Sequence, residues 1–183
     1  MPAFDVWEAF FNPNEIFDAL DLPHDLERAV EFGCGYGTFT IPLCQRLAGI
    51  VESLEMDHAM VRFTHDRAAA LNIHHLILHE ADFDSVDTLI QPESVDLVLL
   101  FNILHGESPD ELIKLSWQLL KSGGRIAVIH WRYDEQTPRG PPMAIRPKPE
   151  ALTTLANNGG FSAGDIVALP PYHYGFTAIK DPS

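Results

Sequence analysis

The sequence has little cysteine and little positive charge. Cys34 and Cys44 are its only two cysteines among 183 residues, too few for a disulfide framework and, by themselves, for a metal site. Twelve Lys and Arg stand against 26 Asp and Glu, and this net charge of −14 opposes binding to nucleic acid or to anionic membranes. The sequence also lacks a run of apolar residues long enough to span a membrane and a signal-peptide pattern at its start. We therefore expect a cytoplasmic protein without nucleic-acid or membrane partners.

The scarce positive charge is concentrated in one segment. Half of the basic residues fall between positions 121 and 150, namely Lys121, Arg125, Arg132, Arg139, Arg146 and Lys148. In an acidic protein such a segment can orient an anionic group, because the guanidinium fork suits a carboxylate or phosphate. It can equally be a solvated loop, and both interpretations stay open.

Apolar runs and helical patterns alternate along the chain, which predicts a doubly wound α/β sheet. The predicted strands are 29–32, 49–55, 75–80, 94–101 and 125–131. The predicted helices are 38–48, 58–71, 108–121 and 149–158. Ser108 followed by Pro109 and Glu111 indicates a capping box at the third of these helices. The chain end, 165–180, predicts two strands in an antiparallel hairpin.

Three glycines at alternate positions follow the first predicted strand, in the run AVEFGCGYGTFTIPL. Gly33, Gly35 and Gly37 cost backbone entropy and bury no side chain, so a bare backbone is needed here. A ligand approaching the turn and the following helix N-terminus would supply that need, and so would tight packing alone. Thr38 stands where a dinucleotide fingerprint would have its third glycine, which disfavours a nucleotide-dependent oxidoreductase.

Acidic residues end the next two predicted strands. Glu55 ends the second strand, where a carboxylate accepts hydrogen bonds from ribose hydroxyls. Asp82, followed by Phe83, comes after the third strand, where it could accept from an adenine amino group. The pattern predicts a nucleoside-containing ligand at the carboxyl edge of the sheet.

The runs EFGCGYGTFT, LEMDHAM, ADFDS, SVDLVLLFNILH and LLKSGGRIAVIHW resemble the successive motifs of the class I S-adenosylmethionine-dependent methyltransferases. The resemblance implies a Rossmann-like, doubly wound seven-stranded sheet of order 3-2-1-4-5-7-6 with strand 7 antiparallel. It also implies one methyltransferase domain over 1–183. Within that domain, 1–28 would form an N-terminal lid, 29–131 the cofactor-binding core, and 132–183 the basic loop, last helix and closing β-hairpin.

The resemblance implies S-adenosyl-L-methionine as the cofactor. The glycine turn would hold its methionine portion, Glu55 its ribose, and the side chains after the third strand its adenine. The implied cofactor-binding residues are Glu31, Gly33, Gly35, Gly37, Glu55, Met56, Asp82, Phe83, Phe101 and Asn102.

Methyl transfer is an in-line displacement, so positioning the acceptor and excluding water can supply most of the catalysis. A general base is needed only where the acceptor loses a proton. His105 is the candidate base, with a purely pocket-closing role as the alternative. The candidate substrate residues are Trp7, Phe11, His130, Trp131 and His173.

His74, His75 and His79 do not predict a metal site, because neighbouring residues on a strand point to opposite faces. The sequence thus predicts methyl transfer to a small-molecule acceptor without a metal. A non-catalytic S-adenosylmethionine-binding protein of the same fold is the alternative, and a nucleotide-dependent oxidoreductase is disfavoured. The acceptor and the oligomeric state stay open.

Overall fold

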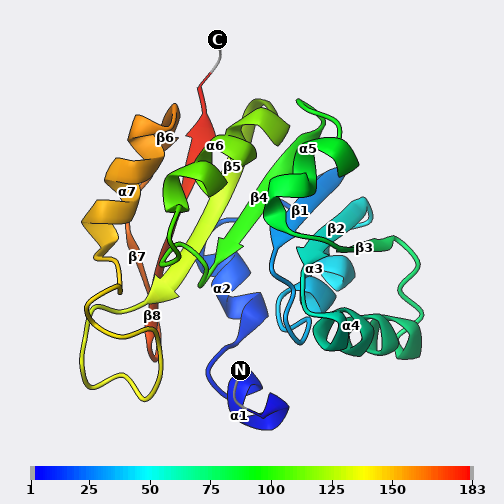
Figure 1. Cartoon of the computed structure of the whole chain (residues 1–183), viewed down its shortest axis with the longest axis horizontal. Coiled ribbons are helices and arrows are strands. Elements are labelled where there is room, and N and C mark those ends of the chain that lie inside the picture. Colours follow the sequence, from blue (N-terminus) through cyan, green and yellow to red (C-terminus); the bar gives the residue numbers. More distant parts are fainter. Residues whose placement is uncertain (1–2, 182–183) are drawn as a thin grey trace.

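A single twisted sheet with helices on both faces forms the centre of the computed structural model, which describes residues 3–181 (Figure 1). The strands are β1 Arg28–Phe32, β2 Ile50–Glu55, β3 Leu76–Glu80, β4 Val95–Phe101, β5 Leu120–Trp131, β6 Phe161–Ala163, β7 Val167–Leu169 and β8 His173–Lys180. The helices are α1 Phe4–Glu8, α2 Pro13–Ala19, α3 Thr40–Arg46, α4 His58–Ala70, α5 Val86–Leu89, α6 Pro109–Leu119 and α7 Pro149–Asn158, with a 3₁₀ turn at Phe83–Ser85.

The strand order is β3-β2-β1-β4-β5-β8-β6, and β7 pairs with β8. Strands β1 to β5 are parallel, whereas β8 runs antiparallel to β5. The predicted Rossmann-like fold is confirmed, with β8 in the place of the expected seventh strand. The chain moves outward from β1 to β3 and then returns to β4, so the topological switch point lies between β1 and β4.

The sheet is buried on both faces because its central strands are almost wholly apolar. Along β4, Val98 and Leu100 pack under α5, α6 and α7, whereas Leu97 and Leu99 pack over α2 and α3. All four side chains are fully buried, and each contributes about 1.5–3 kcal/mol relative to exposure. This two-sided core fixes the strand ends that carry the site.

The structure differs from the sequence predictions at short elements. Strand β6, helix α5 and the 3₁₀ turn were not predicted, because three or four residues carry too little periodicity. Strand β5 begins at Leu120 and includes the two glycines expected to precede it. The predicted capping box was wrong: the Ser108 side chain makes no cap hydrogen bond, and the Glu111 N–H donates to the Ser108 carbonyl at 3.2 Å.

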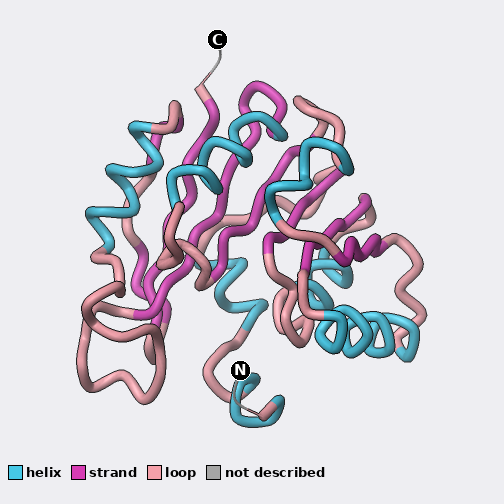
Figure 2. The backbone as a smooth tube through the Cα atoms, in the orientation of Figure 1, coloured by secondary structure: helices cyan, strands magenta, loops and turns pink. Residues whose placement is uncertain are grey.

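A long loop and a short helix lie beyond the carboxyl ends of the strands. Figure 2 shows the loop 132–148 as a long segment without helix or strand that extends past the end of β5. Helix α1 lies at the same end of the sheet (Figure 1). Within residues 3–181, no helix is both long and apolar enough to cross a membrane.

Candidate active site

A cavity of about 610 Å³ opens at the carboxyl ends of β1, β2 and β4. Its walls come from the glycine turn after β1, from the residues that end β2 and β4, and from α3, α4, α1 and the loop after β5. This is the switch point, where ligands bind in open α/β sheets.

The glycine turn has a backbone conformation that residues other than glycine rarely adopt. Gly33, Gly35 and Gly37 have φ of +83°, +50° and +73°, all in the left-handed region. A Cβ on Gly37 would lie 2.9 Å from the Thr64 Cγ2, so α4 packs directly on the turn. The Thr64 hydroxyl also donates to the Gly35 carbonyl at 2.9 Å, which fixes the shape of the turn.

Glu55 links the glycine turn to the end of β2. Its two carboxylate oxygens accept the backbone N–H groups of Gly35 and Asp57, each at 3.0 Å. The carboxylate lines the cavity, and its remaining lone pairs are available to further donors. Asp57 in turn caps α4, accepting from the Ala59 N–H at 2.8 Å.

Two ionisable groups in the floor of the cavity are neutral near pH 7. Burial raises the pKa of the Glu31 carboxyl to about 8, although a hydrogen bond from the Thr40 hydroxyl acts against the shift. Burial likewise raises the pKa of the Cys34 thiol to about 12, so Cys34 is no nucleophile. A cationic ligand group beside Glu31 would favour its ionised form.

Asn102 follows β4 with a left-handed φ of +58°, and its N–H donates to the Ile129 carbonyl at 2.9 Å. Both polar atoms of its side chain are buried at the cavity and have no partner within residues 3–181. Because buried polar groups are normally hydrogen-bonded, this amide is positioned for a ligand.

Aromatic rings form a second part of the cavity wall. Trp7 from α1, Phe39 and Phe101 line it together with Trp131 at the end of β5. The ring centroids of Phe39 and Phe101 are 4.8 Å apart, and those of Trp7 and Trp131 are 6.5 Å apart. This wall suits an apolar body.

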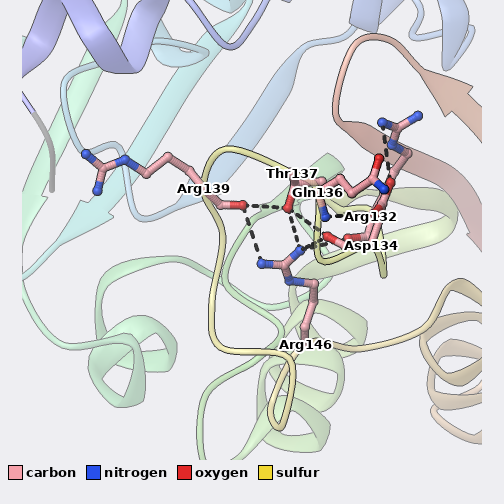
Figure 3. A network of polar contacts seen from close by, with 6 residues as sticks. All are labelled: Arg132, Asp134, Gln136, Thr137, Arg139 and Arg146. Atoms are coloured by element: carbon pink, nitrogen blue, oxygen red, sulfur yellow. Dashed lines mark hydrogen bonds and ion pairs between the residues drawn. The ribbon is translucent and has the colours of Figure 1, made fainter.

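The loop after β5 is folded around one buried arginine (Figure 3). The Arg146 guanidinium donates to the carbonyls of Arg132 and Asp134 at 3.0 and 2.9 Å, and to that of Pro141 at 2.8 Å. The position of Arg146 in the basic segment suggested that it could orient an anion. Its guanidinium instead supports the loop. Arg139 lines the cavity, and its guanidinium points away from this network (Figure 3).

Three histidines lie at the same end of the sheet, but only His105 lines the cavity. Its Nδ1 lies 3.2 Å from the Nε2 of His130, which is fully buried behind it. Burial lowers the pKa of His105, and it lowers those of His130 and His173 to about 4 and about 3. His173 packs between the rings of Phe11 and Trp131, with centroids 4.6 and 4.3 Å away.

Most of the predicted site residues meet at this cavity. It is lined by Trp7, Glu31, Gly33, Gly35, Glu55, Met56, Phe83, Phe101, Asn102, His105 and Trp131. Five others lie outside its lining, namely Phe11, Gly37, Asp82, His130 and His173. Gly37 and the two histidines are buried behind the lining, whereas Asp82 is exposed before the 3₁₀ turn.

Sequence reasoning missed several lining residues. Asp57 and Met60 could have been found, because Asp57 shows the N-cap pattern of the helix that follows β2. Phe39 stood next to the glycine turn in the quoted run. Gly140 and Pro141 carry no local signal, since the buried Arg146 alone brings them to the cavity.

The three histidines considered for a metal do not converge. His75 contacts the Cys44 carbonyl at 2.9 Å, His79 contacts Glu52 at 2.7 Å, and His74 is exposed. Across the described part of the chain, no three His, Cys, Asp or Glu side chains are grouped to hold a metal ion.

Comparisons with known proteins agree with this geometry. A family model described as a methyltransferase domain matches residues 29–124. A solved S-adenosylmethionine-dependent methyltransferase from Aquifex aeolicus has 16% identity and a TM-score of 0.84, over 97% of this chain and 94% of that one. A geranyl diphosphate C-methyltransferase from Streptomyces coelicolor A3(2) has 16% identity and a TM-score of 0.74, over 92% and 79%.

The fold is not confined to methyltransferases. The [4+2]-cyclase SpnF has 15% identity and a TM-score of 0.78, over 93% of this chain and 80% of that one. No curated protein matches the sequence. The matched family model covers more than half of the chain and its motifs form the cavity, so the chain belongs to the class I S-adenosylmethionine-dependent methyltransferases.

Proposed function

We propose that this protein transfers a methyl group from S-adenosylmethionine to a small-molecule acceptor. The observation that carries the proposal is one cavity with two different walls. One wall consists of the glycine turn, Glu55 and an unpartnered Asn102 amide; the other consists of aromatic rings with His105. A cofactor and an acceptor would meet between these walls.

The residues present fit the cofactor. The left-handed turn from Gly33 to Gly37 exposes backbone where a side chain would stand, and Glu55 would accept from ribose hydroxyls. Glu31 would face the methionine portion, and Met56, 67% exposed at the rim, would cover the adenine. When bound, the cofactor supplies an electrophilic methyl group carried by a sulfonium sulfur.

The chain itself contributes positioning and the exclusion of water. Helix α1 acts as a lid: Trp7 lies on the cavity, and Glu8 accepts a hydrogen bond from the Thr38 hydroxyl at 2.5 Å. The segment 1–28 would thus cover the acceptor, with 29–131 holding the cofactor and the loop in 132–183 forming the remaining wall.

The acceptor has an apolar body and an anionic group in this proposal. The aromatic wall suits the first, and Arg139, which lines the cavity, carries a guanidinium that suits the second. The Streptomyces coelicolor relative is a methyltransferase of geranyl diphosphate, a molecule that combines these two features.

Calorimetric titration with S-adenosylhomocysteine and with NAD tests the proposal. We expect the first to bind and the second not to. Glu55→Ala should weaken S-adenosylhomocysteine about 10- to 100-fold, because hydrogen bonds to a charged group contribute about 1.5–3 kcal/mol. Asp165→Ala, at an exposed position outside the cavity, is the matched control. NAD binding without a response to S-adenosylhomocysteine contradicts the proposal, and cofactor binding without methyl transfer in an acceptor screen favours a non-catalytic protein.

A further inference from the structure

Two imidazole rings, one on the cavity and one behind it, are in contact at the aromatic wall. His105, in the loop after β4, lines the cavity, and its Nδ1 lies 3.2 Å from the Nε2 of His130 on β5. The other ring nitrogen of His130, Nδ1, lies 3.4 Å from the Trp131 carbonyl oxygen. The chain thus places a backbone carbonyl, a buried histidine and a cavity histidine in one row.

The order of donors along this row follows from the carbonyl. A carbonyl oxygen only accepts hydrogen bonds, so the proton of a neutral His130 must be on Nδ1. The His130 Nε2 is then an acceptor, and the Nδ1 of His105 must donate to it. This leaves the Nε2 of His105 without a proton, as a base on the ring that faces the cavity.

The surroundings keep both rings neutral. The groups that face His130 are His105, Arg146, His173 and the Tyr174 ring, and none of them is a carboxylate. Within residues 3–181, neither His105 nor His130 hydrogen-bonds an acid. The pKa values of both are lowered, mainly by burial, so the row stays in its neutral form at pH 7.

We propose, on the basis of the proposed function, that His105 is the catalytic base and His130 the positioning residue that sets its tautomer. A base at this position serves only an acceptor that gives up a proton. We assign the acceptor a hydroxyl or thiol group, because such a group attacks well only as it loses its proton, whereas a neutral amine attacks through its free lone pair.

The step conserves atoms and charge. The acceptor oxygen or sulfur forms the new bond to the methyl carbon, and the bond from that carbon to the sulfonium breaks with its electron pair left on sulfur. The acceptor proton moves to the His105 Nε2, which gives an imidazolium. The positive charge thus passes from the sulfonium to His105, whose Nδ1–H keeps its bond to His130.

Nitrogen-15 NMR of the imidazole rings tests the positioning role without any acceptor. In the wild-type protein with S-adenosylhomocysteine, His105 should be the Nδ1–H tautomer. His130→Phe fills the buried space but accepts no hydrogen bond, so His105 should become a mixture of tautomers. His130→Gln, which retains an acceptor, should restore the Nδ1–H form. An Nε2–H tautomer in the wild type overturns the proposal, and this measurement does not depend on a variant that folds.

A matched set of probes tests the acceptor class: 4-hydroxybenzoate, 4-mercaptobenzoate and 4-aminobenzoate share one ring and one carboxylate. We expect labelled methyl on the hydroxyl or thiol compound. His105→Phe should lower kcat about 100- to 10,000-fold. His130→Phe should lower kcat about tenfold and His130→Gln should restore it, with the affinity for S-adenosylhomocysteine unchanged.

The pH profile gives a second readout. In the wild type kcat should fall below pH 6.5, as His105 becomes protonated, and this limb should be absent in His105→Phe. Methylation of the amine alone, or of none of the three while the cofactor binds, overturns the acceptor class. A protein that binds no cofactor would instead contradict the proposed function itself.

Discussion

The two walls of the cavity are built in different ways. The wall that we propose for the cofactor, called the cofactor wall below, comes from short, contiguous runs: the glycine turn, the end of β2 at Glu55, and Asn102 after β4. Its shape depends on backbone conformation, with left-handed φ at Gly33, Gly35 and Asn102. The wall that we propose for the acceptor, called the acceptor wall below, consists of the aromatic rings and His105, together with the loop after β5, whose shape depends on the buried Arg146 side chain. A substitution in one wall can therefore leave the shape of the other unchanged.

The walls also differ in the charges that they bury. The cofactor wall buries an acid, Glu31, whose pKa is raised to about 8. Behind the acceptor wall lie two bases, His130 and His173, whose pKa values are lowered to about 4 and about 3. These shifts destabilise the fold at opposite ends of the pH range. The dependence of stability on pH can therefore be measured separately for each wall.

The largest expected effect is the pH dependence of Glu31→Gln. Glu31 has a folded pKa above its ordinary 4.5, so the folded protein holds a proton that the unfolded chain releases. Its contribution to stability is complete below pH 4.5 and is lost as the pH rises to about 8. Relative to wild type, Glu31→Gln should therefore gain about 1.4 kcal/mol per pH unit across this window.

Urea unfolding at several pH values measures this gain. The histidines have the reverse sign: their contribution is present above pH 6.5 and is lost as the pH falls through about 4. In a plot of the free energy of unfolding against pH, His130→Gln should flatten the acid side and leave the alkaline side unchanged. Parallel curves for wild type and Glu31→Gln would show that Glu31 is ionised in the folded protein.

The cofactor wall was largely predictable from sequence, because each of its residues is local to a strand end. Gly33, Gly35 and Glu55 stand directly after apolar runs, and parallel strands bring such positions to one edge. Their roles as ligands of the cofactor stay predictions. The fold was predictable for the same reason, apart from elements of three or four residues.

The acceptor wall was predictable only in part. Trp131 lines the cavity and His130 lies behind it, because neighbouring residues within a strand point to opposite faces. The role of Arg146 had no signal, because its partners are backbone carbonyls of an irregular loop. Sequence patterns describe side chains and do not specify such contacts.

The next effect compares two glycines of equal conformation. Gly37 and Gly123 have φ of +73° and +77°, but a Cβ on Gly37 would lie 2.9 Å from Thr64, whereas nothing lies within 4 Å at Gly123. Both Gly37→Val and Gly123→Val carry backbone strain, and overpacking should cost Gly37→Val about 1–3 kcal/mol more. Thermal unfolding measures the loss of stability, and titration with S-adenosylhomocysteine measures the loss of affinity. Equal losses in the two variants would mean that crowding by α4 does not shape the turn.

A smaller effect should be confined to the acceptor wall. Arg146→Lys keeps the charge but loses the planar fork that joins the carbonyls of Arg132, Asp134 and Pro141. We expect a loss of about 1–3 kcal/mol and faster proteolysis within 132–141, with the affinity for S-adenosylhomocysteine unchanged. Arg132→Lys is the control, because its guanidinium is half exposed and lies 3.9 Å from Asp134. A loss of cofactor affinity in Arg146→Lys alone would show that the two walls are coupled.

The smallest effect concerns a polar contact between α1, the proposed lid, and the residues of the glycine turn and α4. Glu8 of α1 accepts from the Thr38 hydroxyl and lies 3.6 Å from the Arg67 guanidinium, which in turn donates to the Tyr36 carbonyl in the glycine turn at 2.6 Å. Partly exposed ion pairs contribute about 0.2–1 kcal/mol, so Glu8→Gln should leave global stability almost unchanged. Because α1 buries no residue fully, even this loss should raise the rate of amide hydrogen exchange in 4–8 and of cofactor release. Unaltered exchange in Glu8→Gln would mean that aromatic packing holds α1 in place, since the Phe4 ring lies 5.1 Å from the ring of Phe63 and 5.6 Å from that of Tyr36 in the glycine turn.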